Sequence, residues 1–155
     1  MKVFISGSIS IKTIPQIAID KLNNIIEQNL TIIIGDANGI DSLVQKYLFE
    51  KNYSNVLVYH SGVSIRNNIG NWKTVTVPAN NLTGRAFYTI KDKQMAKDAD
   101  FGMMIWDGHS KGTKANISEM ISLHKHFYII QGETISSDKE LITETIIQQQ
   151  ELFVS

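Results

Sequence analysis

The stretch DFGMMIWDGHSKGTKAN, residues 100–116, decides the fold class of this chain. The apolar run Phe101–Trp106 is typical of a buried strand, and it stops at Asp107-Gly108. A polar turn then leads through Lys111-Gly112-Thr113 into a helical pattern. In open α/β sheets, ligands bind at the carboxyl ends of strands, and the free N–H groups of a helix start favour an anion such as phosphate. We therefore predict a strand, a ligand-binding loop and a helix in this order.

A second copy of the arrangement occurs earlier in the chain. The β-branched run Thr31–Ile34 is followed by GDANGID, residues 35–41, and then by a helical pattern. Two such loops in a chain of 155 residues suggest one pocket that both loops form.

Apolar runs typical of strands alternate with segments of helical period along the chain. This alternation predicts an α/β fold, a single Rossmann-like, doubly wound, mostly parallel sheet of about five strands with helices on both faces. The expected strands are Lys2–Ser6, Thr31–Ile34, Asn55–Tyr59, Phe101–Trp106 and His126–Ile130; the expected helices are Pro15–Asn29, Gly39–Lys51, Arg85–Asp98, Ser110–His124 and a last one to about Glu151, for which Ser136, Ser137 or Asp138 could be the N-cap.

The segment 61–84 is an irregular insertion, with a candidate short strand at Thr74–Val77. Long segments of this kind are often lids or binding loops. The chain length suits one domain with a real core and is too short for two ordinary ones, so we expect a single domain over residues 1–155.

The composition excludes several functional classes. Lys plus Arg and Asp plus Glu both number 15, so the net charge is zero, which argues against a nucleic-acid partner. There is no cysteine for a disulfide or a Cys-ligated metal. No apolar run approaches the roughly 18–20 residues needed to cross a membrane, and MKVFISGS does not read as a signal peptide. We expect a cytoplasmic protein without a membrane partner.

Three loops contain the candidate binding residues. In GDANGID the glycines would let a ligand approach the backbone, although a plain turn in which Asp41 supports the helix start explains the loop equally well. In WDGHSKGT the hydroxyls could donate to phosphate, whereas Asp107 could accept from ribose hydroxyls or form an Asx turn; Trp106 we expect in the core. The candidates are Gly7 and Ser8 in the first loop, Gly35, Asp36, Asn38 and Gly39 in the second, and Asp107, Gly108, Ser110, Gly112 and Thr113 in the third.

Four cations outside these loops are candidates for pairing with a phosphate. Arg66 and Arg85 carry a planar fork that binds two oxygens at once. Lys91 and Lys93 precede the strand at Phe101, where a solvated helical face is the alternative interpretation. The histidines show no metal-ligand spacing, and we expect neither a metal nor a separate cofactor.

The order of these loops resembles the SLOG superfamily of Rossmann-like nucleotide-binding proteins, which includes the lonely-guy phosphoribohydrolases and the DNA-processing protein A domain. GDANGID is similar to the Gly-Ile-Asp loop of the DNA-processing branch, and KDKQMA, residues 91–96, lies where its Arg-Asn-Arg segment would. The similarity covers roughly residues 1–130 with a gap at the insertion. It implies a nucleotide-binding domain and, from related proteins, a homo-oligomer.

One departure from the superfamily concerns catalysis. Its phosphoribohydrolases carry a Gly-Gly-x-Gly-Thr-x-x-Glu loop, and here Gly112-Thr113 is kept while Asn116 stands at the position of the glutamate. A carboxamide cannot act as a base or a nucleophile. Glu119, one turn further, is the candidate substitute. The fainter likeness to nucleoside deoxyribosyltransferases, which also use a catalytic glutamate, is weakened by the same residue.

Three functional hypotheses follow. The leading one is a protein that binds a nucleotide or a nucleotide-derived small molecule, with Lys91, Lys93 or Arg66 supplying positive charge and Asp36 and Asp107 contacting hydroxyls. The alternative is an N-glycosidic-bond enzyme, a nucleotide phosphoribohydrolase or nucleoside deoxyribosyltransferase, with Asp107 or Glu119 as its carboxylate. The third is a DNA-binding accessory module, which the zero net charge weakens.

Overall fold

The structure, a computed structural model, describes residues 1–140. Strands and helices alternate along most of this part of the chain, as expected from the sequence. The elements in chain order are β1 (Lys2–Gly7), α1 (Gln16–Glu27), β2 (Thr31–Gly35), α2 (Ile40–Glu50), β3 (Val56–Ser61), β4 (Lys73–Val77), α3 (Gly84–Asp98), β5 (Phe101–Ile105), α4 (Lys111–Ser122), β6 (His126–Gln131) and β7 (Thr134–Ser137).

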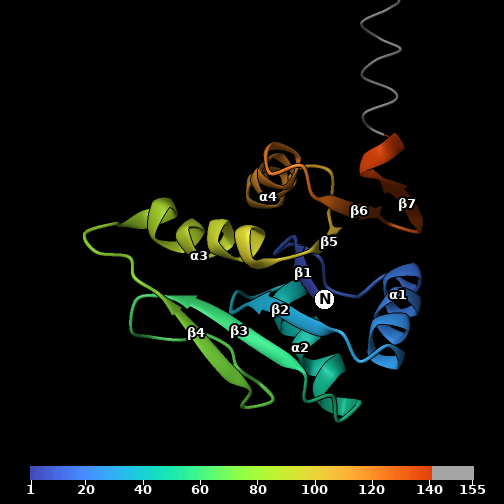
Figure 1. Ribbon diagram of the computed structural model, residues 1–155, viewed down its shortest axis with the longest axis horizontal. Coiled ribbons are helices and arrows are strands. Elements are labelled where there is room, and N and C mark those ends of the chain that lie inside the picture. The colour runs from blue at the N-terminus through green and yellow to red at the C-terminus, as the bar shows by residue number, and fades with distance from the viewer. Residues whose placement is uncertain (141–155) are drawn as a thin grey trace, which may run out of the picture.

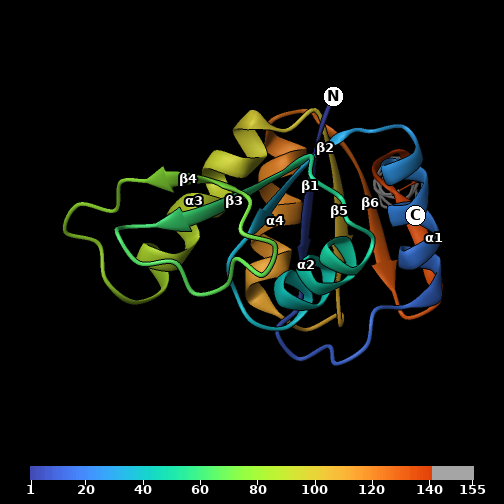
Figure 2. The same cartoon turned by 90° about the horizontal axis from the view of Figure 1, so that it is seen from below.

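The strands form one seven-stranded sheet in the order β4-β3-β2-β1-β5-β6-β7. All neighbouring strands run parallel except β6 and β7. The chain moves outward from β1 to β4 and then returns through α3 to place β5 on the other side of β1 (Figures 1 and 2). The direction of winding therefore reverses between β1 and β5, which is where a doubly wound sheet opens a crevice at its carboxyl edge.

Helices cover both faces of the sheet. Helices α1 and α2 pack on one face and α3 and α4 on the other (Figure 1). The central strands are mostly apolar because both of their faces are buried; in β1, for example, Val3 and Ile5 enter the core under α1 and α2, and Phe4 enters the core under α3 and α4. The prediction of an α/β fold with a mostly parallel sheet is confirmed.

The expected number of about five strands is wrong, because two short strands extend the sheet. Strand β4 pairs with β3 at one edge and confirms the candidate strand in the insertion. Strand β7 pairs antiparallel with β6 after a tight turn at Gly132, whose φ is +59°. Its sequence TISS has no apolar alternation, and the local pattern favours a helix cap over a strand. The segment is nevertheless a strand, because its backbone pairs with β6.

The expected last helix falls largely on residues 141–151, outside the described part of the chain. Of its three proposed caps, Ser137 is placed like one, since its Oγ accepts a hydrogen bond from the Glu140 N–H at 3.4 Å. Asp138 acts elsewhere: its carboxylate accepts the Phe127 N–H and pairs with His126.

The insertion is pinned to the sheet by a buried glutamine of α2. The Gln45 side chain is fully buried, and its Nε2 donates to the carbonyl oxygens of Gly35 and Asn67 at 3.0 and 3.1 Å. Its Oε1 accepts the Ile69 N–H at 2.9 Å. The segment between β3 and β4 is thereby fastened beside the carboxyl ends of β2 and β3, where it becomes one wall of the site described next.

Candidate functional site

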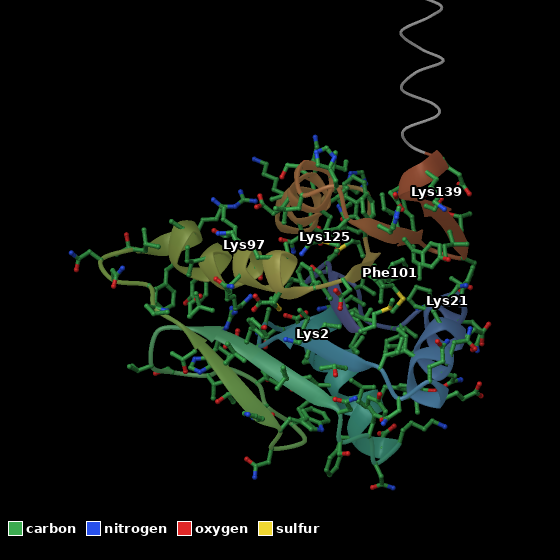
Figure 3. All side chains as sticks on the ribbon, in the orientation of Figure 1. Lys2, Lys21, Lys97, Phe101, Lys125 and Lys139 are labelled. Carbon is green, nitrogen blue, oxygen red and sulfur yellow. The ribbon has the colours of Figure 1, made fainter. Side chains whose placement is uncertain are left out.

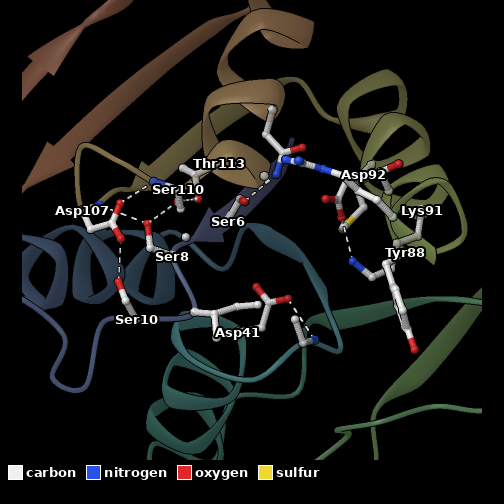
Figure 4. Close-up of a pocket in the computed structure, with 18 of the residues that line it drawn as sticks. Ser6, Ser8, Ser10, Asp41, Tyr88, Lys91, Asp92, Asp107, Ser110 and Thr113 are labelled. Carbon is white, nitrogen blue, oxygen red and sulfur yellow. Dashed lines mark hydrogen bonds and ion pairs between the residues drawn. The ribbon is translucent and has the colours of Figure 1, made fainter.

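A cavity of about 580 Å³ opens at the carboxyl ends of β1 and β5, at the point where the winding reverses (Figure 4). The starts of α2 and α4, the side of α3 and the insertion enclose it. Most of the side chains that line it are polar, and they come from segments far apart in the sequence. The lining residues from β1 and the loop after it are Phe4, Ser6, Gly7, Ser8, Ile9, Ser10 and Lys12. Those between β2 and β4 are Ala37, Asp41 and Arg66, and those of α3 are Arg85, Tyr88, Thr89, Lys91, Asp92 and Met95. The loop after β5 and the start of α4 contribute Asp107, Ser110, Gly112, Thr113 and Asn116.

Serine and threonine hydroxyls connect β1 to the start of α4. Ser8 Oγ lies 2.7 Å from Ser110 Oγ, and Ser110 Oγ donates to Thr113 Oγ1 at 3.1 Å. Deeper in the cavity Asn116 Nδ2 donates to Ser6 Oγ at 2.7 Å, and both residues are buried. These contacts hold the first turn of α4 against the end of β1.

The N-terminus of α4 faces this cavity without a side-chain cap. Ser110 is the cap residue by position, but it makes no side-chain hydrogen bond to the helix backbone. Gly112 leaves open space, since a Cβ added there would meet nothing within 4 Å. The N–H groups of the first turn therefore combine with the hydroxyls of Ser110 and Thr113 in an environment that favours an anion.

Asp107 organises the loop that leads to α4. Its Oδ1 accepts the N–H groups of His109 and Ser110 at 2.8 and 2.7 Å, which is the Asx-type turn considered from the sequence. Its Oδ2 accepts Ser10 Oγ at 2.6 Å (Figure 4). The hydrogen bonds from Ser10 and from the Ser110 and His109 backbone hold the pKa of Asp107 below its ordinary value, so this carboxylate remains ionised.

A buried lysine lies between carboxylates at the other end of the cavity. Lys91 is 4% exposed, and its Nζ forms an ion pair with Asp92 Oδ1 at 2.7 Å (Figure 4). Burial alone would lower the pKa of Lys91, but Asp92 and Asp41 outweigh it and the pKa is raised. Burial raises the pKa of the Asp41 carboxyl to about 7, against the opposing effect of Lys91.

Arg66 reaches this end of the cavity from the insertion. Its guanidinium pairs with Asp36 at 2.8 Å and lies over the Tyr88 ring, 4.5 Å from the ring centroid. The Asp36 carboxylate also accepts the Arg66 backbone N–H. Burial alone would raise the pKa of Asp36, but the hydrogen bonds and charge of Arg66 lower it. Arg66 is thus an oriented cation with most of its N–H donors free of Asp36.

The structure brings part of the predicted binding set together in one cavity. The candidates that line it are Gly7, Ser8, Arg66, Arg85, Lys91, Asp107, Ser110, Gly112 and Thr113. The other candidates, which are Gly35, Asp36, Asn38, Gly39, Lys93, Gly108 and Glu119, are not among the lining residues. Trp106 is partly buried against the core, as expected, and its Nε1 donates to the Ser110 carbonyl at 3.0 Å.

The candidates outside the lining have identifiable structural contacts. Asp36 holds Arg66, and Asn38 Oδ1 accepts Asn67 Nδ2, so the GDANGID loop anchors the insertion. Gly39 adopts a φ of +74° and packs on Ile9, where a Cβ would lie 2.4 Å from the Cα atom. Lys93 is exposed on the far side of α3 from the buried Lys91.

Several cavity residues were not predicted from the sequence. Tyr88 and Asp92 lie on α3 one turn apart around Lys91, a helical spacing that is visible only once the cavity-facing side of α3 is known. Ser6 and Ser10 flank the predicted Gly7-Ser8 and repeat its hydroxyl chemistry. The remaining unpredicted polar residues are Lys12, Asp41, Thr89 and Asn116.

A second group of cations lies at the opposite end of the sheet. Lys2 and Lys125 lie where β1 and β6 begin, and Lys97 lies in the last turn of α3 (Figure 3). Lys125 Nζ donates to the carbonyl oxygens of Ala96 and Lys97, so this ammonium group caps the C-terminal end of α3. The cations at the cavity are therefore a separate set.

Among residues 1–140, no cluster of three or more histidine, aspartate or glutamate side chains is placed to hold a metal ion. No helix in the described part of the chain is long and apolar enough to cross a membrane.

The fold and the site define an α/β protein with a mostly parallel sheet and, at its topological switch point, a cavity that polar and charged residues line together with apolar ones. Comparison with protein-family models, with curated proteins and with solved structures finds no match to this chain.

Proposed function

We propose that this Rossmann-like protein binds a nucleotide or a nucleotide-derived small molecule in the cavity between β1, β5 and α3. The observation that carries the proposal is the uncapped N-terminus of α4, which meets the hydroxyls of Ser8, Ser110 and Thr113 at one end of the cavity. A phosphate group accepts hydrogen bonds from all of these donors.

The charges around the cavity also suit a phosphorylated ligand. Four cationic side chains line it against three carboxylates, and the raised pKa of Asp41 reduces the negative charge further near neutral pH. At the end away from Ser110, Tyr88 offers an aromatic ring to a base (Figure 4). The cations are Lys12, Arg66, Arg85 and Lys91, and the carboxylates are Asp41, Asp92 and Asp107.

We further propose that the chain is a divergent SLOG protein. The support is that two segments quoted for that resemblance meet at the cavity: Asp41 of GDANGID and Lys91 of KDKQMA both line it, and the charge of Lys91 acts on the Asp41 carboxyl. The Gly112-Thr113 pair of the third segment lines the same cavity.

Gly112→Asp tests the phosphate site directly. The cavity-facing space at Gly112 accepts a side chain, and an acidic residue in the first turn of a helix favours helix formation, so the fold is retained. Isothermal titration calorimetry with AMP, GMP, CMP and UMP should show at least one complex with the wild type. We expect Gly112→Asp to weaken that complex by about tenfold or more through charge repulsion.

Gly112→Asn is the matched control because it adds nearly the same bulk without charge, and we expect it to weaken binding by about threefold or less. Equal losses in the two variants would contradict the phosphate placement, and no binding of any of the four nucleotides by the wild type would contradict the proposed function.

An enzyme acting on an N-glycosidic bond is the second candidate function. It is favoured by Asp41 at the cavity wall, because a carboxyl whose pKa is about 7 can serve as acid or base near neutral pH. Asp92 places a second carboxylate at the same wall. Glu119 lies outside the lining and Asp107 is committed to its loop, so the carboxylates first considered for this role are less well placed.

Chromatography of nucleotides incubated with the protein tests this second candidate. Release of free base by the wild type, lost in Asp41→Asn while calorimetry still detects binding, would establish turnover. The absence of base release from all four nucleotides would remove this candidate and leave the binding function.

A further inference from the structure

A buried serine hydroxyl without a partner lies next to the main cavity. Ser61, the last residue of β3, is 4% exposed, and its Oγ has no hydrogen-bond partner among residues 1–140. Tyr59 of the same strand packs in the core under α3, so by strand alternation Ser61 also faces α3. A buried hydroxyl left without a partner is costly, and such groups in native proteins need an explanation.

The Ser61 side chain lines a small cavity of about 90 Å³. Arg66 and Tyr88 belong to the walls of both this cavity and the main one, so the cation–ring stack of these two residues is the partition between them. The wall is completed by Phe87, whose ring meets the Tyr88 ring edge-on, and by Asp36 and Ser64.

The chemistry of the small cavity favours an uncharged, flat group with hydrogen-bonding atoms at its edge. The charge of Arg66 is already balanced by Asp36 at 2.8 Å, so the cavity offers no excess charge to a second phosphate. Arg66 retains free N–H donors, Ser61 can donate or accept, and two aromatic side chains form the rest of the wall. The volume equals that of about three water molecules, enough for the edge of a ring but not for a large substituent.

We propose that this small cavity is a second chamber of the ligand site, in which Ser61 and Arg66 hydrogen-bond the edge of the ligand's base. This inference rests on the proposed nucleotide-binding function and specifies how the site distinguishes one base from another. The phosphate then lies at α4 and the base at Tyr88, at opposite ends of the main cavity (Figure 4). The ring edge passes beside the Arg66–Tyr88 stack to reach Ser61.

Two substitutions at Ser61 distinguish the effect of losing its hydrogen bond from the effect of filling the small cavity. Ser61→Ala removes the hydroxyl and keeps the cavity, whereas Ser61→Val fills the cavity with methyl groups. Binding is measured by calorimetry with AMP, GMP, CMP, UMP and ribose 5-phosphate, the last being a probe without a base. Thr74→Val, an exposed position on the neighbouring strand β4, is the control for a β-branched substitution outside both cavities.

We expect the preferred nucleotide to lose about fivefold in affinity in Ser61→Ala, the effect of one hydrogen bond, and more than about tenfold in Ser61→Val. Ribose 5-phosphate should bind all four proteins equally, because its contacts lie at α4. The differences in affinity among the four nucleotides should become smaller in both Ser61 variants.

Unchanged nucleotide affinity and base ranking in both Ser61 variants would overturn the second chamber and assign the small cavity to water only. In that case binding of the nucleotides and ribose 5-phosphate by the wild type would leave the proposed function standing. Equal losses for ribose 5-phosphate and the nucleotides would also overturn the chamber, since the substitution would then act on the whole site. Failure of all probes to bind the wild type would overturn both proposals.

Discussion

At the scale of single residues, two glycines show how the surroundings decide what a position tolerates. Gly39 and Gly84 both have a positive φ, of +74° and +58°, and each precedes or begins a helix. A Cβ at Gly39 would lie 2.4 Å from the Ile9 Cα atom, whereas one at Gly84 would meet nothing within 4 Å. The sequence pattern marked Gly39 as a ligand contact; its observed neighbour is the loop after β1.

Alanine at these two positions should therefore have different effects on stability. We expect Gly84→Ala to lower the free energy of unfolding by about 1 kcal/mol, because alanine is less stable than glycine in a left-handed backbone conformation. Gly39→Ala adds a steric collision to a backbone conformation that suits only glycine, and we expect it to lower the free energy of unfolding by about 3 kcal/mol or more. Urea denaturation of both variants measures this difference; equal losses would contradict the close packing of the α2 start on the loop after β1.

At the scale of elements, the insertion between β3 and β4 contributes a wall of the site although its sequence has no regular pattern. Irregular backbone has few internal hydrogen bonds, so its order must come from other elements. Here the side chain of Gln45 in α2 forms hydrogen bonds with the backbone of Asn67 and Ile69. The carboxylate of Asp36, which follows β2, accepts the Arg66 backbone N–H. The position of Arg66 in the cavity is thus a consequence of contacts made by α2 and by the GDANGID loop.

Gln45→Ala should loosen this segment while the sheet persists. The substitution removes the acceptor of the Ile69 N–H and the donor to two carbonyl oxygens, and we expect hydrogen exchange at the Ile69 amide to rise at least about tenfold. The free energy of unfolding should fall by about 2 kcal/mol. Gln16→Ala on the exposed side of α1 is the control, with little change in either quantity. Persistent protection of Ile69 in Gln45→Ala would show that other contacts order the insertion.

At the scale of the whole molecule, the doubly wound topology places ionisable groups of three separate segments in one crevice. Asp41 lies in the first turn of α2, Lys91 in the middle of α3 and Asp107 just after β5, and each lines the same cavity. Burial shifts the pKa of Asp41 upward, while hydrogen bonds shift that of Asp107 downward. The two carboxyl groups therefore respond to pH in different ranges.

The Asp41 shift predicts a dependence of global stability on pH. Because the folded state raises this pKa from 3.8 to about 7, the folded state binds the proton more tightly, and its contribution to stability is present below about pH 4 and is lost as pH rises to about 7. We expect the free energy of unfolding of the wild type, relative to Asp41→Asn, to fall by up to about 4 kcal/mol over that range.

Denaturant unfolding of both proteins at several pH values measures the effect. Taking the difference cancels the other titrating groups, since the two proteins share them. A difference that stays constant between pH 4 and 7 would mean that Lys91 keeps Asp41 ionised throughout.

The sequence by itself determined the alternation of strands and helices, the parallel character of the sheet and the three loops at its carboxyl edge. These features are local: apolar runs such as Thr31–Ile34, helical periods and glycine turns are encoded within a few consecutive residues. The candidate strand at Thr74–Val77 was also visible in the sequence as an alternation of threonine and valine. Strand β7, with the sequence TISS, carries no such pattern, and only its pairing with β6 makes it a strand.

Only the tertiary structure decided which side chains share the site. Ser8 meets Ser110 and Ser6 meets Asn116 across more than a hundred residues of chain, because β1 and β5 become neighbours in the sheet order. Asp36 and Gly39 occur in as suggestive a motif as Thr113, yet they turn toward the insertion and the loop after β1. Contacts of this length depend on how the elements pack, and local spacing carries no information about them.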